Sequence, residues 1–140
     1  MSEQLETLRH STAHVMAAAV LDLFPDTVIG IGPATDEGFY YDFAFKERLL
    51  PEQLPKIEAR MREIVKAAPP FIKEEVPREE AVALFERLHQ PLKVEVIGDK
   101  VTDATARLYR TGDFVDLCLG PHVADAGKPE AFRLLSIAGA

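Results

Sequence analysis

The sequence has one cysteine and no apolar run approaching the ~20 residues needed to cross a membrane. A single cysteine cannot form an intramolecular disulfide, so a reducing, cytoplasmic environment is expected. The N-terminus lacks the basic start and apolar core of a secretory signal. Basic residues are the minority, with 16 Lys and Arg against 23 Asp and Glu and a formal net charge of −7. Broad, sequence-independent binding to nucleic acid is therefore not expected, because such affinity comes from neutralising many phosphates. An acidic domain could still contact the end of an RNA that a partner domain holds.

Length and composition fit an ordinary globular domain. The chain has 140 residues, of which 47% are hydrophobic and 28% are charged, both near the average for folded domains. It contains no internal repeat and no low-complexity tract. We therefore expect a single domain over residues 1–140.

Hydrophobic periodicity and turn residues predict an α+β fold, in which an antiparallel sheet packs with a long central N-terminal helix and further helices as a two-layer sandwich. The first helix has apolar residues on two sides, so other elements should enclose it. The pattern predicts helices at 2–24, 51–68 and 77–88. It predicts strands at 27–32 and 37–45 (as a hairpin), 71–76, 92–97, 107–118 (with a bend at Gly112) and 132–137.

Two short motifs carry reactive side chains. His10 and His14 are four residues apart, so on a helix both rings emerge from one face. Cys118 and His122 flank a Gly-Pro turn that can bring them towards one point, and strand alternation places Asp116 on the face of Cys118. Each pair alone fits an ordinary surface or packing role. Together, three imidazoles and a thiol can form a tetrahedral zinc site or a hydrolytic pocket without metal.

Three segments in combination resemble the editing domain of bacterial-type threonyl-tRNA synthetase. Related domains occur in alanyl-tRNA synthetase and in free-standing alanyl-tRNA deacylases. The segments are Arg9-His10-Ser11-Thr12-Ala13-His14, Ile31-Gly32-Pro33 with Gly38-Phe39-Tyr40-Tyr41-Asp42, and Asp116-Leu117-Cys118-Leu119-Gly120-Pro121-His122. The resemblance runs from about Leu5 to Ala140, and the terminal Ser136-Ile137-Ala138-Gly139-Ala140 favours the threonyl member.

The resemblance implies proofreading of mischarged seryl-tRNA(Thr) by hydrolysis of its aminoacyl ester. By motif position, His10 would orient or activate the water. His14 and His122 would line the pocket and hold the substrate. Cys118 would lie beside the aminoacyl group without acting as a covalent nucleophile.

Three further residues are expected in the site from the same resemblance. Asp116 would be the counter-ion of the substrate's α-ammonium, and Tyr41 would cap the pocket or bond the side-chain hydroxyl. Lys93 would contribute to hydrolysis. Two of these residues also have plain structural interpretations. Tyr41 fits the aromatic core of a sheet, and Lys93, which alternates with Leu92 and Val94, fits a solvated surface charge.

Within this family, free-standing alanyl deacylases use the same pattern to hold zinc, whereas threonyl-type editing domains generally work without it. The threonyl-type motifs therefore predict no metal here. If zinc is bound, its ligands would be His10, His14, Cys118 and His122.

The resemblance also bears on the parent protein and its partners. The chain is expected to be an excised domain that contacts the 3′ aminoacyl end of tRNA(Thr). The parent synthetase is expected to use zinc and ATP–magnesium in its other domains and to form a homodimer through them. Two other functions stay open: a free-standing zinc-dependent seryl- or alanyl-tRNA deacylase, and a non-catalytic tRNA-binding accessory module.

Overall fold

The computed structural model describes residues 2–118 and 120–138. These residues form four α-helices and two small antiparallel sheets, so the predicted α+β class is confirmed, with the sheet divided in two. Three residues of the motifs that carry the family resemblance, Leu119, Gly139 and Ala140, lie outside the described residues. Across the described ranges, no helix combines the length and the apolar character needed to cross a membrane.

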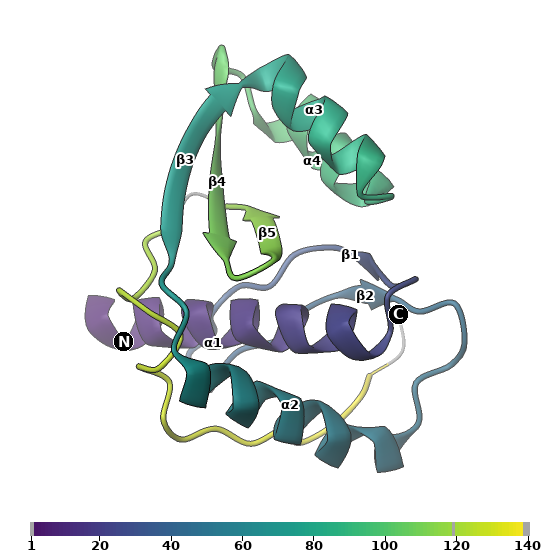
Figure 1. Ribbon diagram of the computed structural model, residues 1–140, viewed down its shortest axis with the longest axis vertical. Helices are drawn as coiled ribbons and strands as arrows, with labels where there is room; N and C mark the ends of the chain where they lie inside the picture. Colours follow the sequence, from purple (N-terminus) through teal and green to yellow (C-terminus); the bar gives the residue numbers. More distant parts are fainter. Residues whose placement is uncertain (1, 119, 139–140) are drawn as a thin grey trace.

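Helix α1 (Glu3–Leu23) runs through the middle of the molecule (Figure 1). The Ser2 side chain caps its start by accepting a hydrogen bond from the Leu5 N–H at 3.1 Å. Pro25 follows the last turn, where a proline cannot continue a helix. Every residue from Ser11 to Val20 is buried except Met16, which is half-buried. The predicted enclosure of this helix is confirmed.

The layer around α1 contains α2 and a short hairpin. Helix α2 (Leu54–Ala67) follows a 3₁₀ turn, η1 (Pro51–Gln53), and packs along α1. Strands β1 (Val28–Ile29) and β2 (Phe43–Ala44) pair antiparallel, as predicted, but they are shorter than the sequence suggested. The shared core lies between α1, α2 and the hairpin. It includes Val15, Ile29, Tyr41, Ile57 and Met61.

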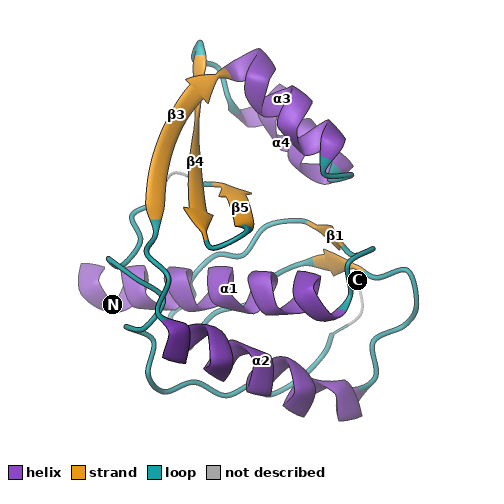
Figure 2. Cartoon of the chain, viewed as in Figure 1, coloured by secondary structure: helices purple, strands orange, loops and turns teal. Residues whose placement is uncertain are grey.

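The second sheet has the order β3-β4-β5 and is antiparallel throughout (Figure 2). Its strands are β3 (Ile72–Pro77), β4 (Thr105–Thr111) and β5 (Phe114–Leu117). Gly112, with φ +61°, supplies the left-handed residue of the predicted bend between β4 and β5.

The two faces of β5 serve two different cores. Val115 packs in the core beneath α3 (Arg78–Arg87) and α4 (Pro91–Lys100), whereas Phe114 joins the core around α1. The β4–β5 ribbon therefore lies between α1 and the α3–α4 pair. This alternation leaves Asp116 and Cys118 on the α1 side, as the sequence predicted.

Residues 92–97 are helical, so the predicted strand is wrong. They lie in α4, with Pro91 in its first turn, where a missing N–H costs nothing. The alternating Val and Ile residues favour a strand, but the two buried residues are Lys93 and Ile97, which are four apart. Packing of this helical face against its neighbours therefore outweighs the local β propensity.

Residues 132–137 form no strand within the described chain, although one was predicted. This segment lies along α2, where the Leu134 N–H donates to the Glu58 carboxylate at 2.6 Å. The Arg62 guanidinium lies 5.6 Å from the centre of the Phe132 ring. Because its neighbour is a helix, the segment meets no sheet edge with which to form a ladder.

A buried amide joins the start of α4 to the β1–β2 hairpin. Gln90 is buried, its Oε1 accepts the Ile29 N–H at 2.8 Å, and its Nε2 donates to the Thr27 carbonyl at 3.1 Å. This bridge fixes α4 three residues before Lys93 and thereby orients the helix towards the core around α1.

Replacing Gln90 by alanine should lower the free energy of unfolding by about 2–4 kcal/mol, because two buried backbone groups lose their partners. Denaturant unfolding measures this loss. Gln53→Ala is the matched control, since Gln53 also accepts a backbone N–H, from Leu50 at 2.7 Å, but at an exposed site. That control should change stability by no more than about 0.5 kcal/mol. Equal losses in the two variants would show that the buried bridge has no special role.

Candidate functional site

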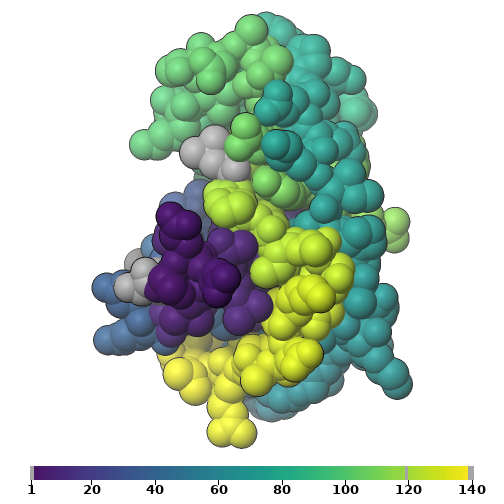
Figure 3. Space-filling view, turned by 90° about the vertical axis from the view of Figure 1, so that its left-hand side faces the viewer, coloured from purple at the N-terminus to yellow at the C-terminus, as the bar shows by residue number. Residues whose placement is uncertain are grey.

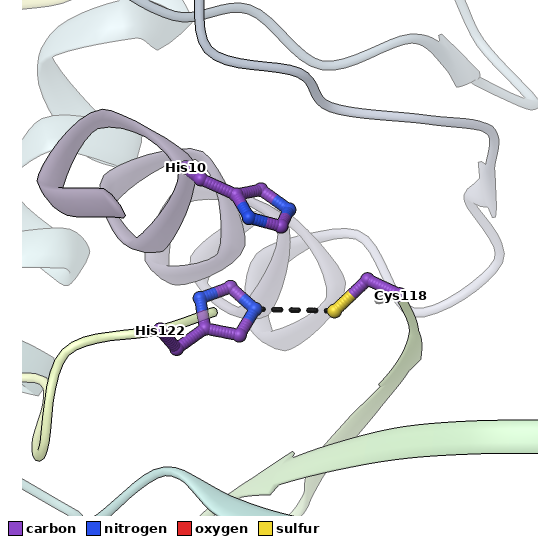
Figure 4. A group of neighbouring side chains, drawn as sticks. All are labelled: His10, Cys118 and His122. Carbon is purple, nitrogen blue, oxygen red and sulfur yellow. Dashed lines mark hydrogen bonds between the residues drawn. The ribbon is translucent and has the colours of Figure 1, made fainter. Parts of the chain in front are cut away.

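His10, Cys118 and His122 come together from three parts of the chain (Figure 4). His10 lies on α1, Cys118 follows β5, and His122 lies in the loop beyond it; one ligand atom from each lies within 4.8 Å of the other two. The His10 and His122 rings stack with centroids 4.4 Å apart, and His122 Nε2 lies 3.1 Å from Cys118 Sγ. One residue of the first motif and two of the second therefore lie together in the structure.

The return of the chain between Cys118 and His122 depends on Gly120. Its φ of +74° is in the left-handed region that side chains disfavour, and the Tyr109 side chain occupies the space that a Cβ would need. Tyr109 also packs edge-on against the His122 ring, with centroids 4.6 Å apart.

His14 lies deeper than the other two histidines. It is 2% exposed, its Nε2 lies 3.0 Å from the Thr111 hydroxyl, and its ring meets Phe71 and Phe114 edge-on. The structure therefore does not bring His14 to the cleft side of the cluster. His14 packs behind His122, with ring centroids 4.9 Å apart, and lies outside the three-residue cluster.

His122 is held on both faces and at both ring nitrogens. His10 stacks on one side and Phe71 on the other, the latter with centroids 4.7 Å apart and planes 9° apart. Nδ1 lies 2.9 Å from Ser11 Oγ, while Nε2 contacts Cys118. Sequence reasoning missed Ser11; the available signal was a small polar residue between two histidines on a helix predicted to be enclosed.

Burial keeps the imidazoles of the site neutral. It lowers the pKa of His10 below 6.5, an effect partly offset by a hydrogen bond to the Pro121 carbonyl and by the charge of Asp116. Burial, followed by repulsion from neighbouring positive charge, lowers the pKa of His14 to about 3 and that of His122 to about 2. At neutral pH these rings are therefore neutral imidazoles, each with one nitrogen that donates and one that accepts.

Cys118 remains a thiol. Burial is the main cause that raises its pKa to about 12, and the charge of Asp116 adds to the effect. Because the thiolate is the nucleophilic form of cysteine, a thiol in this state attacks an ester poorly.

A buried ion pair lies beside this cluster. Lys93 Nζ contacts Asp116 Oδ1 at 2.5 Å, and the side chains are 3% and 7% exposed. The Tyr41 hydroxyl donates to Asp116 Oδ2 at 2.8 Å, and the Tyr41 ring stacks on Phe43. The surface interpretation of Lys93 is therefore wrong, because the helix turns Lys93 inward on the same face as Ile97. The ring of Tyr41 lies in the core, as its structural interpretation expected, while its hydroxyl contacts the buried ion pair.

An open cleft of about 780 Å³ borders the cluster at His10. Its walls are the first turns of α1, including Glu3 and Glu6, and two loop segments. The loop residues are Pro33, Ala34, Gly120, Pro121 and Val123. In the space-filling view, the purple start of α1 lies at the surface between blue and yellow-green segments (Figure 3). Among the described residues, His10 is the one imidazole of the cluster that lines this cleft.

Comparison with known proteins finds one matching family and a set of similar enzymes. Residues 106–139 match the family described as "Threonyl and Alanyl tRNA synthetase second additional domain". A threonine–tRNA ligase of Dehalococcoides mccartyi (strain CBDB1) is 54% identical over 97% of this chain and 23% of its own length. The corresponding ligase of Nitratidesulfovibrio vulgaris (strain DP4) is 54% identical over 99% of this chain and 21% of its own length. That of Geobacillus sp. (strain WCH70) is 48% identical over the whole chain and 22% of its own length.

Over residues 106–139 the chain therefore matches this family, and over nearly its whole length it is similar to threonine–tRNA ligases. It spans about a fifth of the length of the curated relatives it matches. The family resemblance seen in the sequence motifs is thus confirmed.

The side chains of the cluster are of types that bind zinc. Two imidazoles and a thiol are ordinary zinc ligands, and three protein ligands leave the fourth position open, as in catalytic zinc sites. The fourth predicted ligand, His14, directs Nε2 to Thr111. The described residues therefore offer three ligands rather than the four that the motifs suggested.

Breaking the buried ion pair should destabilise the fold strongly. Lys93→Met is expected to lower the free energy of unfolding by about 3–5 kcal/mol, because it leaves the Asp116 carboxylate buried without a counter-ion. Adding Asp116→Asn should restore much of this loss, since the amide oxygen can still accept from Tyr41. Urea unfolding of the single and double variants measures both effects.

Lys46→Met provides the matched surface control. Lys46 lies 3.9 Å from Asp26, and both side chains are more than three-quarters exposed, so this pair should contribute less than about 1 kcal/mol. A Lys93→Met variant no less stable than Lys46→Met would contradict the assigned role of the buried pair.

Proposed function

We propose that the chain is the editing domain of a threonyl-tRNA synthetase and that it hydrolyses the aminoacyl ester of mischarged seryl-tRNA(Thr). The observation that carries this proposal is the position of His10. Within the described chain, it is the neutral imidazole that combines contact with the Cys118–His122 cluster and a place on the wall of an open cleft.

Hydrolytic editing is needed because binding alone cannot distinguish threonine from serine well enough. A synthetic site that binds threonine gains only about 1–3 kcal/mol from the methyl group that serine lacks, so serine is sometimes attached. A second site that is too small for that methyl group can hydrolyse the serine product and leave the threonine product intact.

The protonation state of His10 suits a general base. One ring nitrogen donates its proton to the Pro121 carbonyl, which leaves the lone pair of the other nitrogen available. In the proposed reaction, water attacks the ester carbonyl and gives a proton to this nitrogen. The tetrahedral oxyanion then collapses, the bond to the ribose oxygen breaks, and His10 returns the proton to that oxygen. The products are serine and tRNA with a free terminal hydroxyl.

The Lys93–Asp116–Tyr41 group supplies charge next to His10. The charges of Asp116 and Lys93 both act on the His10 imidazole, so the three groups share one electrostatic environment. A carboxylate has about four acceptor positions, and Tyr41 and Lys93 use two of those on Asp116. We assign the remaining capacity to the α-ammonium of the substrate, and Lys93 to stabilisation of the developing oxyanion.

The remaining residues of the site hold His10 and its neighbours in place and take no part in the bond changes. His122 stacks on its ring, His14 packs behind His122, and Cys118 accepts or donates at His122 Nε2 as a neutral thiol. The proposed hydrolysis needs no metal. Should zinc bind, His10, Cys118 and His122 would hold it, and it would supply Lewis-acid activation of water.

The proposed partner is the 3′ aminoacyl end of tRNA(Thr), presented by the other domains of the synthetase. The cleft carries Glu3 and Glu6 on its wall, and the chain has a formal net charge of −7. These charges are unfavourable for a phosphate backbone. Most of the tRNA affinity should therefore come from elsewhere in the synthetase.

Replacing His10 by alanine should slow serine release from seryl-tRNA(Thr) by about 100- to 10,000-fold, the usual contribution of a positioned acid or base. The fold should survive, because His10 lies at the edge of the cleft rather than in the core. Serine release and the thermal midpoint are measured on the same preparation.

His89→Asn is the control for His10→Ala. His89 is the histidine outside the site, is exposed, and has a φ of +57°, which asparagine tolerates well. It should keep the rate of the unmodified chain. If His10→Ala also keeps that rate while folded, His10 is not the base; if it unfolds, the role of His10 is structural.

A further inference from the structure

Ser11 is a fully buried hydroxyl at the centre of the site. It lies on α1 with 0% exposure, between His10 and the enclosed part of the helix. Its Oγ accepts the Val123 N–H at 3.0 Å and lies 2.9 Å from His122 Nδ1. The hydroxyl thus contacts both the backbone and the imidazole of the loop that carries His122.

The hydrogens of this group have a preferred arrangement. A serine hydroxyl has one proton and two lone pairs, and the Val123 N–H occupies one lone pair. If the hydroxyl proton goes to His122 Nδ1, every group is satisfied, because Nδ1 is then an acceptor and Nε2 carries the ring proton. In the reverse arrangement the buried hydroxyl proton has no acceptor among the described residues, and a buried donor without a partner lowers stability.

The same arrangement fits the other side of the ring. With its proton on Nε2, His122 donates to Cys118 Sγ, which lies 3.1 Å away and is a neutral thiol able to accept. The chain of hydrogen bonds then runs in one direction, from the Val123 N–H through Ser11 and His122 to Cys118. His10 and Phe71 stack on the two faces of the His122 ring and so hold the ring in the plane of these hydrogen bonds.

We propose that Ser11 is a positioning residue that holds His122 in the tautomer with the proton on Nε2. This assignment rests on the proposed function of His10. In the assigned tautomer, the lone pair of His122 lies on Nδ1 and accepts the hydroxyl proton of Ser11. His122 then cannot compete for the proton of the attacking water, and His10 is left as the base at the cleft. Ser11 acts through His122 and contacts no reacting atom itself.

The test is a tautomer measurement by NMR on the ¹⁵N-labelled chain at neutral pH. Ring ¹⁵N chemical shifts distinguish a nitrogen that bears a proton from one that bears a lone pair, and the chain has only four histidines to assign. The unmodified chain should show His122 protonated at Nε2 and bare at Nδ1. A proton on Nδ1 would overturn the proposal, and this result needs no variant.

Ser11→Ala and Thr12→Ala form a matched pair of variants. Each removes one buried hydroxyl from α1, but Thr12 Oγ1 donates within the helix itself, to the Leu8 carbonyl at 2.7 Å. Ser11→Ala should give a mixture of His122 tautomers and a loss of about 10- to 100-fold in serine release, comparable to the loss of a partner that orients an active-site histidine. Thr12→Ala should keep the single tautomer and the rate.

The outcomes separate the two proposals. If Ser11→Ala keeps both the single tautomer and the rate, Ser11 has no positioning role. If the tautomers behave as expected but the unmodified chain releases no serine from seryl-tRNA(Thr), the assignment of Ser11 stands and the editing function fails. If Ser11→Ala does not fold, the spectrum of the unmodified chain decides alone.

Discussion

The enclosure of α1 is the constraint on which the rest of the structure depends. Because this helix is buried from Ser11 to Val20, each polar side chain there must find a partner inside the protein. Thr12 uses the helix itself, but Ser11 and His14 reach out to other elements. His14 meets Thr111 at the end of β4, and Ser11 meets the loop after β5. The partners that satisfy the buried helix are thus the segments that carry the site.

The site lies where two small cores meet. The core around α1 contributes His10 and the Tyr41 hydroxyl, and the α3–α4 side contributes Lys93. Asp116 on β5 connects them, since its two oxygens contact Tyr41 and Lys93 separately. A charge pair so deeply buried is a costly way to hold a fold together. The charges of this pair act on the His10 imidazole, which is the position that the proposed function uses.

The sequence was informative where periodicity and spacing act locally. The helix that carries both His10 and His14, the bend at Gly112 and the alternation along β5 each depend on one element, and each is confirmed. Helix α4 was mistaken for a strand because its valines favour strands, whereas its conformation is decided by how Lys93 and Ile97 pack. Because the segment was taken for a strand, Lys93 was expected at the surface instead of in the interior. Ser11 could not be found from spacing, because its partners are more than 100 residues away in the sequence.

The most direct test of the account is the relative rate at which the chain releases serine and threonine from tRNA(Thr). Both esters are measured under single-turnover conditions at neutral pH, after dialysis against a chelator that removes zinc. The account predicts serine release well above the spontaneous rate and at least about tenfold faster than threonine release, because the site excludes one methyl group. Equal rates for the two esters, or loss of serine release once metal is removed, would contradict it.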